Sequence, residues 1–123
     1  MTRAARRNIV EVESVDDIRR LCPANTSCSL LKFGAKWCGP CQEVRPKVQS
    51  WLAEEAPECI AVFEADADEA EDLFEKFKIR SLPTFVVLRK DLSIAETLVT
   101  SDFAKVRIAV NDHVARSAPG NDF

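Results

Sequence analysis

Two cysteines three residues apart, Cys38 and Cys41, lie between an apolar run and a helical pattern, and this feature constrains the chain most. Residues with this spacing on the first turn of a helix are roughly 5–6 Å apart, within the Cα separation that a disulfide accepts. The pair can therefore form and break a disulfide without a large backbone movement. Gly39 leaves the approach to sulfur unobstructed, and Pro40 suits a first helical turn because its missing N–H would be unpaired there.

Cys38 is expected at the N-terminus of this helix, where unpaired N–H groups and the positive end of the helix dipole stabilise a thiolate. Because the thiolate is the nucleophile, this position makes an inert thiol reactive. Zinc binding is a poorer interpretation, since it needs a second pair at similar spacing, which is not offered by Cys22, Cys28, Cys59 or His113. The three remaining cysteines are expected to be small buried hydrophobic side chains.

The composition is that of one globular domain, with 123 residues of which 46% are hydrophobic and 30% charged. A net charge of −3 argues against a general affinity for nucleic acid or for an anionic membrane surface. No apolar run approaches the roughly 20 residues that a membrane-spanning helix needs. Only three glycines are present, which disfavours a glycine-rich phosphate site.

Residues 1–7 contain three arginines and no acid, and they lack the apolar core of a secretory signal. They are interpreted either as a flexible, solvated tail or as the remnant of a mitochondrial presequence. The odd number of cysteines, five, without a secretory leader predicts a reducing compartment inside the cell, mitochondrial or cytoplasmic. Residues 8–116 are predicted to form one domain, and residues 117–123 a flexible C-terminal tail.

Apolar runs and helical periodicity predict an α/β fold with nine elements in the order β-α-β-α-β-α-β-β-α. The expected strands cover residues 8–12, 28–35, 59–63, 84–88 and 94–99. Four helices are expected. The first follows an N-cap at Ser14, and the second begins at about Cys41. The third covers residues 68–77, and the fourth begins at about Ser101. Helices that alternate with buried strands imply a central mixed sheet, largely parallel, with helices on both faces and an antiparallel hairpin at the end.

The segment Trp37-Cys38-Gly39-Pro40-Cys41 after a strand resembles the active-site motif of the thioredoxin family. The resemblance extends over residues 9–114, and it implies the thioredoxin fold. Pro46 stands where the family has a proline that kinks the helix. The segment Ile79–Thr84 resembles the family's loop with a cis-proline beside the disulfide, which would be Pro83.

The resemblance also implies an activity and its partners. The Cys38 thiolate would attack a disulfide of a client protein, and Cys41 would then resolve the mixed disulfide and release the reduced client. A thioredoxin reductase or another dithiol donor would restore the pair, with no cofactor beyond this redox-active disulfide and no metal. The protein would act as a monomer. The surface that binds an extended client segment would comprise Trp37, Gly39, Pro40, Leu82 and Pro83.

Lys32 departs from the family pattern, because six residues before the first active cysteine thioredoxins usually carry a buried aspartate. Counting back from Pro83 places Glu64 where the family usually has a buried lysine. Together the two departures predict a catalytic ion pair with exchanged charges, since an opposed pair persists in a core where a lone charge is costly. The alternative is that Lys32 reaches water from a strand end. A charged Lys32 would stabilise a Cys41 thiolate, whereas a neutral one would act as a base.

Two further departures concern the surroundings of the disulfide. Gly34 stands where the family has a tryptophan, and it is expected to open space behind the active site. Val99 or Thr100 replaces a glycine near the substrate surface, where a β-branched residue is expected to narrow the groove. We therefore predict a substrate-specialised protein-disulfide reductase. An oxidase or isomerase of the same fold, and a partner-binding module with little catalysis, are the alternatives.

Overall fold

Five strands form one mixed sheet in the structure, a computed structural model that describes residues 7–117. They are β1 (Val10–Glu11), β2 (Cys28–Gly34), β3 (Ile60–Asp66), β4 (Thr84–Arg89) and β5 (Ile94–Val99). Their order across the sheet is β1-β3-β2-β4-β5. β1, β3 and β2 run parallel to one another, whereas β4 is antiparallel to both β2 and β5. The predicted mixed sheet with a terminal hairpin is confirmed.

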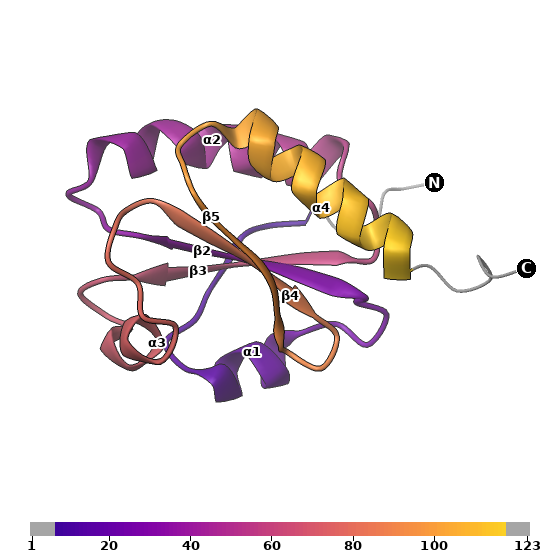
Figure 1. Cartoon of the computed structure of the whole chain (residues 1–123), viewed down its shortest axis with the longest axis horizontal. Coiled ribbons are helices and arrows are strands. Elements are labelled where there is room, and N and C mark those ends of the chain that lie inside the picture. Colours follow the sequence, from indigo (N-terminus) through magenta and orange to yellow (C-terminus); the bar gives the residue numbers. More distant parts are fainter. Residues whose placement is uncertain (1–6, 118–123) are drawn as a thin grey trace, which may run out of the picture.

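Two helices cover each face of the sheet (Figure 1). α2 (Gly39–Glu54) and α4 (Phe103–Ser117) lie on one face, and α1 (Val15–Leu21) and α3 (Glu71–Lys76) on the other. Successive side chains of a strand point to opposite faces, so Leu30 packs under α2 and α4 whereas Leu31 packs toward α1 and α3. Because both faces are covered, every residue of β2 is buried and most residues of β2 and β3 are apolar, with Ser29 and Lys32 as the polar exceptions in β2.

The predicted order of nine elements is confirmed, and some bounds differ. β3 continues three residues beyond its predicted end, because β1 and β2 hydrogen-bond to it on its two sides. α3 is shorter than the predicted 68–77, because residues 67–69 form a turn in which the Asp68 N–H donates to the Asp66 carboxylate at 2.8 Å. α2 and α4 begin within two residues of their predicted starts.

The ends of the folded region also differ slightly from the prediction. Arg7, assigned to the N-terminal tail, donates hydrogen bonds to the carbonyls of Ala56 and Pro57 at 2.7 Å. Ser117, assigned to the C-terminal tail, is the last residue of α4. The other residues of the two predicted tails, 1–6 and 118–123, lie outside the described residues. Within residues 7–117, none of the helices is long and apolar enough to cross a membrane.

Candidate active site

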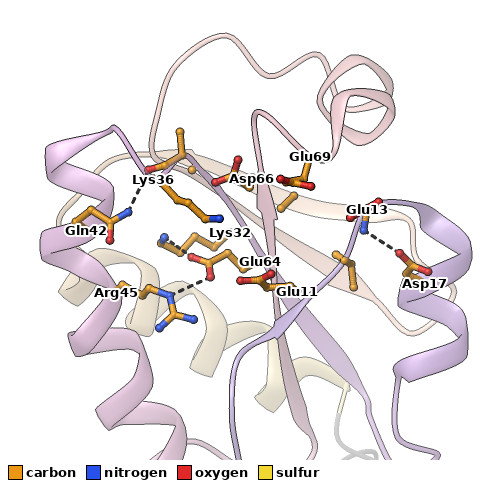
Figure 2. Close-up of a pocket in the computed structure, with 14 residues that line it drawn as sticks. Glu11, Glu13, Asp17, Lys32, Lys36, Gln42, Arg45, Glu64, Asp66 and Glu69 are labelled. Carbon is orange, nitrogen blue, oxygen red and sulfur yellow. Dashed lines mark hydrogen bonds and ion pairs between the residues drawn. The ribbon is translucent and has the colours of Figure 1, made fainter.

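Lys32 lies in the middle of β2 and directly opposite Glu64 on the parallel strand β3, so both side chains emerge on the same face of the sheet. The Lys32 ammonium donates to Glu64 Oε2 at 2.8 Å, and the lysine is only 1% exposed (Figure 2). Contact with a carboxylate offsets the cost of burying this ammonium. The predicted ion pair is therefore present in the fold, and the alternative in which Lys32 reaches water is wrong.

Arg45 is a third member of this cluster, and no motif in the sequence pointed to it. Its Nε donates to Glu64 Oε1 at 3.0 Å, so the two carboxylate oxygens bind two separate cations (Figure 2). Arg45 lies four residues after Cys41, one turn further along α2. Side chains at this spacing share a helix face, and this is the signal by which the sequence would have indicated Arg45.

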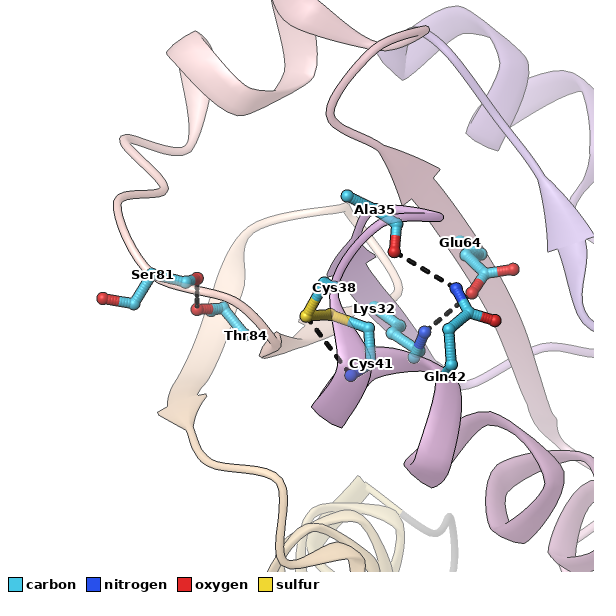
Figure 3. Close-up of a disulfide and its surroundings, with 8 residues drawn as sticks. All are labelled: Lys32, Ala35, Cys38, Cys41, Gln42, Glu64, Ser81 and Thr84. Carbon is cyan, nitrogen blue, oxygen red and sulfur yellow. Dashed lines mark hydrogen bonds and ion pairs between the residues drawn. A yellow bond between two sulfur atoms is a disulfide. The ribbon is translucent and has the colours of Figure 1, made fainter.

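Beyond the end of β2, a short loop leads to a disulfide between Cys38 and Cys41, whose Cα atoms are 5.3 Å apart (Figure 3). Cys38 is the N-cap residue of α2, as the spacing predicts, and the Cys41 backbone N–H donates to its Sγ at 3.3 Å. Cys38 is 8% exposed, whereas Cys41 is fully buried. In the reduced protein this N–H group and the helix dipole would stabilise a thiolate on the cysteine that retains exposed surface.

Gly34, the last residue of β2, borders a cavity, as expected, but the position of its missing side chain is already surrounded by other atoms. A methyl group on Gly34 would lie 3.2 Å from Cys41 Sγ and 3.3 Å from Lys32 Nζ. The Lys32 ammonium thus borders the space behind the disulfide. It extends into the place that a larger side chain at residue 34 would occupy. Cys41 Sγ and Lys32 Nζ are consequently both close to the position that a Gly34 side chain would take.

The residues predicted to bind substrate fall into two groups. Trp37, Gly39 and Pro40 are exposed beside the disulfide, and the Trp37 indole N–H donates to Asp68 at 3.2 Å. Trp37 is 68% exposed, in contrast to the buried Trp51 on α2. A tryptophan this exposed is free to contact another molecule, because only one edge of its ring is occupied by an internal partner.

The second group is in the loop before β4. The Leu82–Pro83 peptide bond is cis, as the resemblance implied. Leu82 packs against Cys38 and Cys41, and Pro83 is buried beside it in sequence. The Thr84 hydroxyl donates to the Ser81 carbonyl at 2.7 Å and closes this loop (Figure 3). The fold therefore brings Leu82, 41 residues beyond Cys41, into contact with the disulfide.

The remaining cysteines and the histidine lie apart from this cluster. Cys28 is buried, as predicted, whereas Cys22 and Cys59 are only half-buried, because they lie just outside α1 and β3. Burial raises the pKa of the Cys28 thiol, and nearby Cys59 adds to the effect. His113 on α4 pairs with Glu96 at 2.9 Å. In the described part of the chain, no group of three or more His, Cys, Asp or Glu side chains is arranged to hold a metal ion.

A five-stranded mixed sheet with a disulfide at a helix N-terminus and a cis-proline loop beside it defines a class of dithiol–disulfide proteins. The chain belongs to the thioredoxin family, whose profile, described as Thioredoxin, matches residues 13–112. It is 38% identical over 88 residues to thioredoxin-1 of Drosophila melanogaster, a match that covers 71% of this chain and 81% of that protein.

Solved structures of the family are similar in fold. The thioredoxin of Fasciola hepatica matches with a TM-score of 0.75 at 28% identity, over 85% of this chain and 99% of that one. The thioredoxin of Malassezia sympodialis matches with a TM-score of 0.74 at 26% identity, over 91% and 96%. The predicted thioredoxin fold is confirmed, and family membership implies thiol–disulfide oxidoreductase activity, disulfide-containing clients and a reductase partner.

Proposed function

We propose that this protein is a protein-disulfide reductase that cycles Cys38 and Cys41 between dithiol and disulfide. The observation that carries the proposal is the Cys41 N–H directed at Cys38 Sγ, at 3.3 Å, on the N-terminal turn of α2. A donor in this position, together with the helix dipole, stabilises negative charge on the sulfur that attacks. Cys38 is the nucleophile because, of the two cysteines, it is the one with exposed surface.

The reaction has two exchange steps. The Cys38 thiolate attacks a sulfur of the client disulfide, a new S–S bond forms, and the other client sulfur leaves as a thiolate. Cys41 then attacks Cys38 Sγ, and the second client thiolate leaves. The client gains two electrons, and the protein is left with the Cys38–Cys41 disulfide. A thioredoxin reductase, or another dithiol donor, returns the two electrons to the pair.

The proposed client is an extended segment of a disulfide-containing protein. Exposed Trp37, Gly39 and Pro40 would contact it on one side of the disulfide, and Leu82 and Pro83 on the other, where a polypeptide backbone can pair with the loop. Val99 is exposed at the end of β5 and lies opposite Thr84. Its side chain would leave a narrower groove for the client than a glycine at this position. We therefore propose a restricted set of clients.

The proposed setting is a reducing compartment inside the cell, the mitochondrion or the cytoplasm, in which the protein acts as a monomer. Three cysteines that form no disulfide, Cys22, Cys28 and Cys59, support a reducing environment. Lys32 and Glu64 are proposed to act on the second exchange step from behind Cys41.

Reduction of insulin by dithiothreitol, followed by turbidity, tests the proposal. The protein should accelerate precipitation, Cys38→Ser should return the rate to that of dithiothreitol alone, and Cys22→Ser should retain the full rate as a control. In a lysate, Cys41→Ser should accumulate mixed disulfides with clients, because the resolving thiol is missing. A wild-type protein that does not accelerate precipitation, or a fully active Cys38→Ser variant, would refute the assignment.

A further inference from the structure

We infer that Lys32 acts on Cys41 as a permanent ammonium, held by Glu64 and Arg45, which stabilises the Cys41 thiolate and accepts no proton from it. The inference deepens the proposed function and rests on it, since it concerns the same dithiol cycle. Arg45 enters as a positioning residue, because its contact is with the Glu64 carboxylate.

The first step is proximity. Lys32 Nζ and Cys41 Sγ lie 3.3 Å and 3.2 Å from the place where a side chain on Gly34 would begin. Both groups are buried, so bulk solvent screens their interaction only weakly. The absence of a side chain on Gly34 therefore leaves the ammonium and the sulfur on the border of the same small space.

The second step is the charge of Lys32. Glu64 Oε2 is in direct contact with the Lys32 ammonium at 2.8 Å. Arg45, the cation that repels this ammonium, binds the other carboxylate oxygen, and its side chain is 39% exposed. Coulomb energy falls with distance and with exposure to water, so the attraction of Lys32 to Glu64 exceeds its repulsion from Arg45 and offsets the cost of burying the ammonium. An ammonium has three donors and no acceptor, so Lys32 cannot serve as the base for Cys41.

The third step is the sum of charges behind Cys41. Glu64 alone would cancel the charge of Lys32, but Arg45 adds a second cation to the same carboxylate, at 3.0 Å (Figure 2). The three groups together carry one excess positive charge. Arg45 also fixes the orientation of Glu64, because each oxygen has its own donor. The ion-pair cluster behind Cys41 therefore presents one excess positive charge to its thiolate.

These three groups border a cavity of about 580 Å³ between α2 and the β1 edge of the sheet. Figure 2 shows Glu13 and Asp17 across this cavity from Arg45. The other charged groups that line it, from every neighbouring element, are Glu11, Glu13, Asp17, Lys36, Asp66 and Glu69. All six remain in each variant proposed below, so differences between variants report on Lys32 and Arg45.

The consequence concerns the second exchange step. An ionised Cys41 attacks Cys38 Sγ with its own electron pair, the S–S bond forms, and the client thiolate leaves and takes a proton from water. No base is needed at Cys41. A stabilised thiolate also stabilises the reduced protein relative to the disulfide, which makes the pair a weaker reductant than it would be without the excess charge.

Equilibration of the Cys38–Cys41 pair with glutathione at several pH values tests the inference. Lys32→Met should shift the equilibrium constant toward the disulfide by about ten-fold, or about 30 mV. Arg45→Gln should shift it in the same direction by a smaller factor, and Arg45→Lys should restore it. Arg107→Gln is the matched control, since Arg107 lies on α4, is 44% exposed and pairs with Glu55 at 3.3 Å. The equilibrium constant of this variant should equal that of wild type.

An unchanged constant in folded Lys32→Met would overturn the inference, as would slow resolution of the mixed disulfide with no shift, the result expected of a base. If circular dichroism shows that Lys32→Met does not fold, the two Arg45 variants decide. An equilibrium constant that is unchanged in Arg45→Gln, or not restored in Arg45→Lys, would then overturn the inference. Failure to reduce insulin would refute the proposed function and leave this measurement intact, because glutathione needs only the cysteine pair.

Discussion

Replacing Gly34 by alanine probes how closely Lys32 and Cys41 pack behind the disulfide. The added methyl group would lie 3.2 Å from Cys41 Sγ, 3.3 Å from Cys41 Cβ and 3.3 Å from Lys32 Nζ. All three contacts are shorter than ordinary van der Waals separations, and the neighbours are buried. An extra methyl group in a filled site of this kind costs about 1–3 kcal/mol.

Urea denaturation and thermal melting of oxidised Gly34→Ala measure this cost. At about 4 °C per kcal/mol for a domain of this size, the melting temperature should fall by about 4–12 °C. The lysine end must also give way to the methyl group, and we expect the equilibrium constant with glutathione to shift toward the disulfide, as for Lys32→Met but by less.

Gly39→Ala is the matched control for this experiment. A methyl group on Gly39 would have no atom within 4 Å, and Gly39 is the first residue of α2. Alanine there should leave the free energy of unfolding unchanged or raise it by up to about 1 kcal/mol, because it lowers the entropy of the unfolded chain. If Gly34→Ala proved as stable as Gly39→Ala, the space behind the disulfide would be open and the reasoning would fail.

Three further predictions concern Glu64, Cys28 and Asp17. Glu64→Ala, which leaves Lys32 with no carboxylate in contact, should cost about 3–5 kcal/mol in urea denaturation, and a loss below 1 kcal/mol would contradict the burial argument. Because burial raises the pKa of Cys28, iodoacetamide near pH 8 should alkylate this thiol far more slowly than the active-site nucleophile, as mass spectrometry would show. The Glu13 backbone N–H lowers the pKa of Asp17, so this carboxylate stabilises the fold above its unfolded pKa of about 4, and the stabilisation is lost as pH falls through the lower folded value. Asp17→Asn should therefore be less stable than wild type at pH 7, and the deficit should shrink as pH falls below about 4. A deficit that stays the same across this range would exclude the linkage.

The order of elements was predictable because apolar runs and helical periodicity are local properties of the chain. β2 and β4 were found nearly to the residue, since each is a mostly apolar run covered by helices on both faces. The end of β3 was missed, because Glu64 and Asp66 lack the apolar character of a buried strand. They belong to it through hydrogen bonds to β1 and β2, which no local pattern encodes.

The residues of the candidate active site also divide into those that the sequence revealed and those that only the fold brought together. Cys38 and Cys41 were identifiable because the two thiols and the N–H groups that act on them lie within one helical turn, where spacing alone sets the geometry. Lys32 and Glu64, 32 residues apart, were paired only through the resemblance to the family. Their contact depends on the register of two parallel strands, which the sequence does not display.

Amino-acid order alone thus determined where a reactive thiol would be, because a helix creates its own field from its own backbone. Only the tertiary structure decided what faces the second thiol. Arg45 meets Glu64 because α2 lies across β3, and Gly34 leaves room that Lys32 fills, so the charge behind Cys41 is the sum of groups from three separate segments. Electrostatic interactions depend on distance in space, and folding sets that distance.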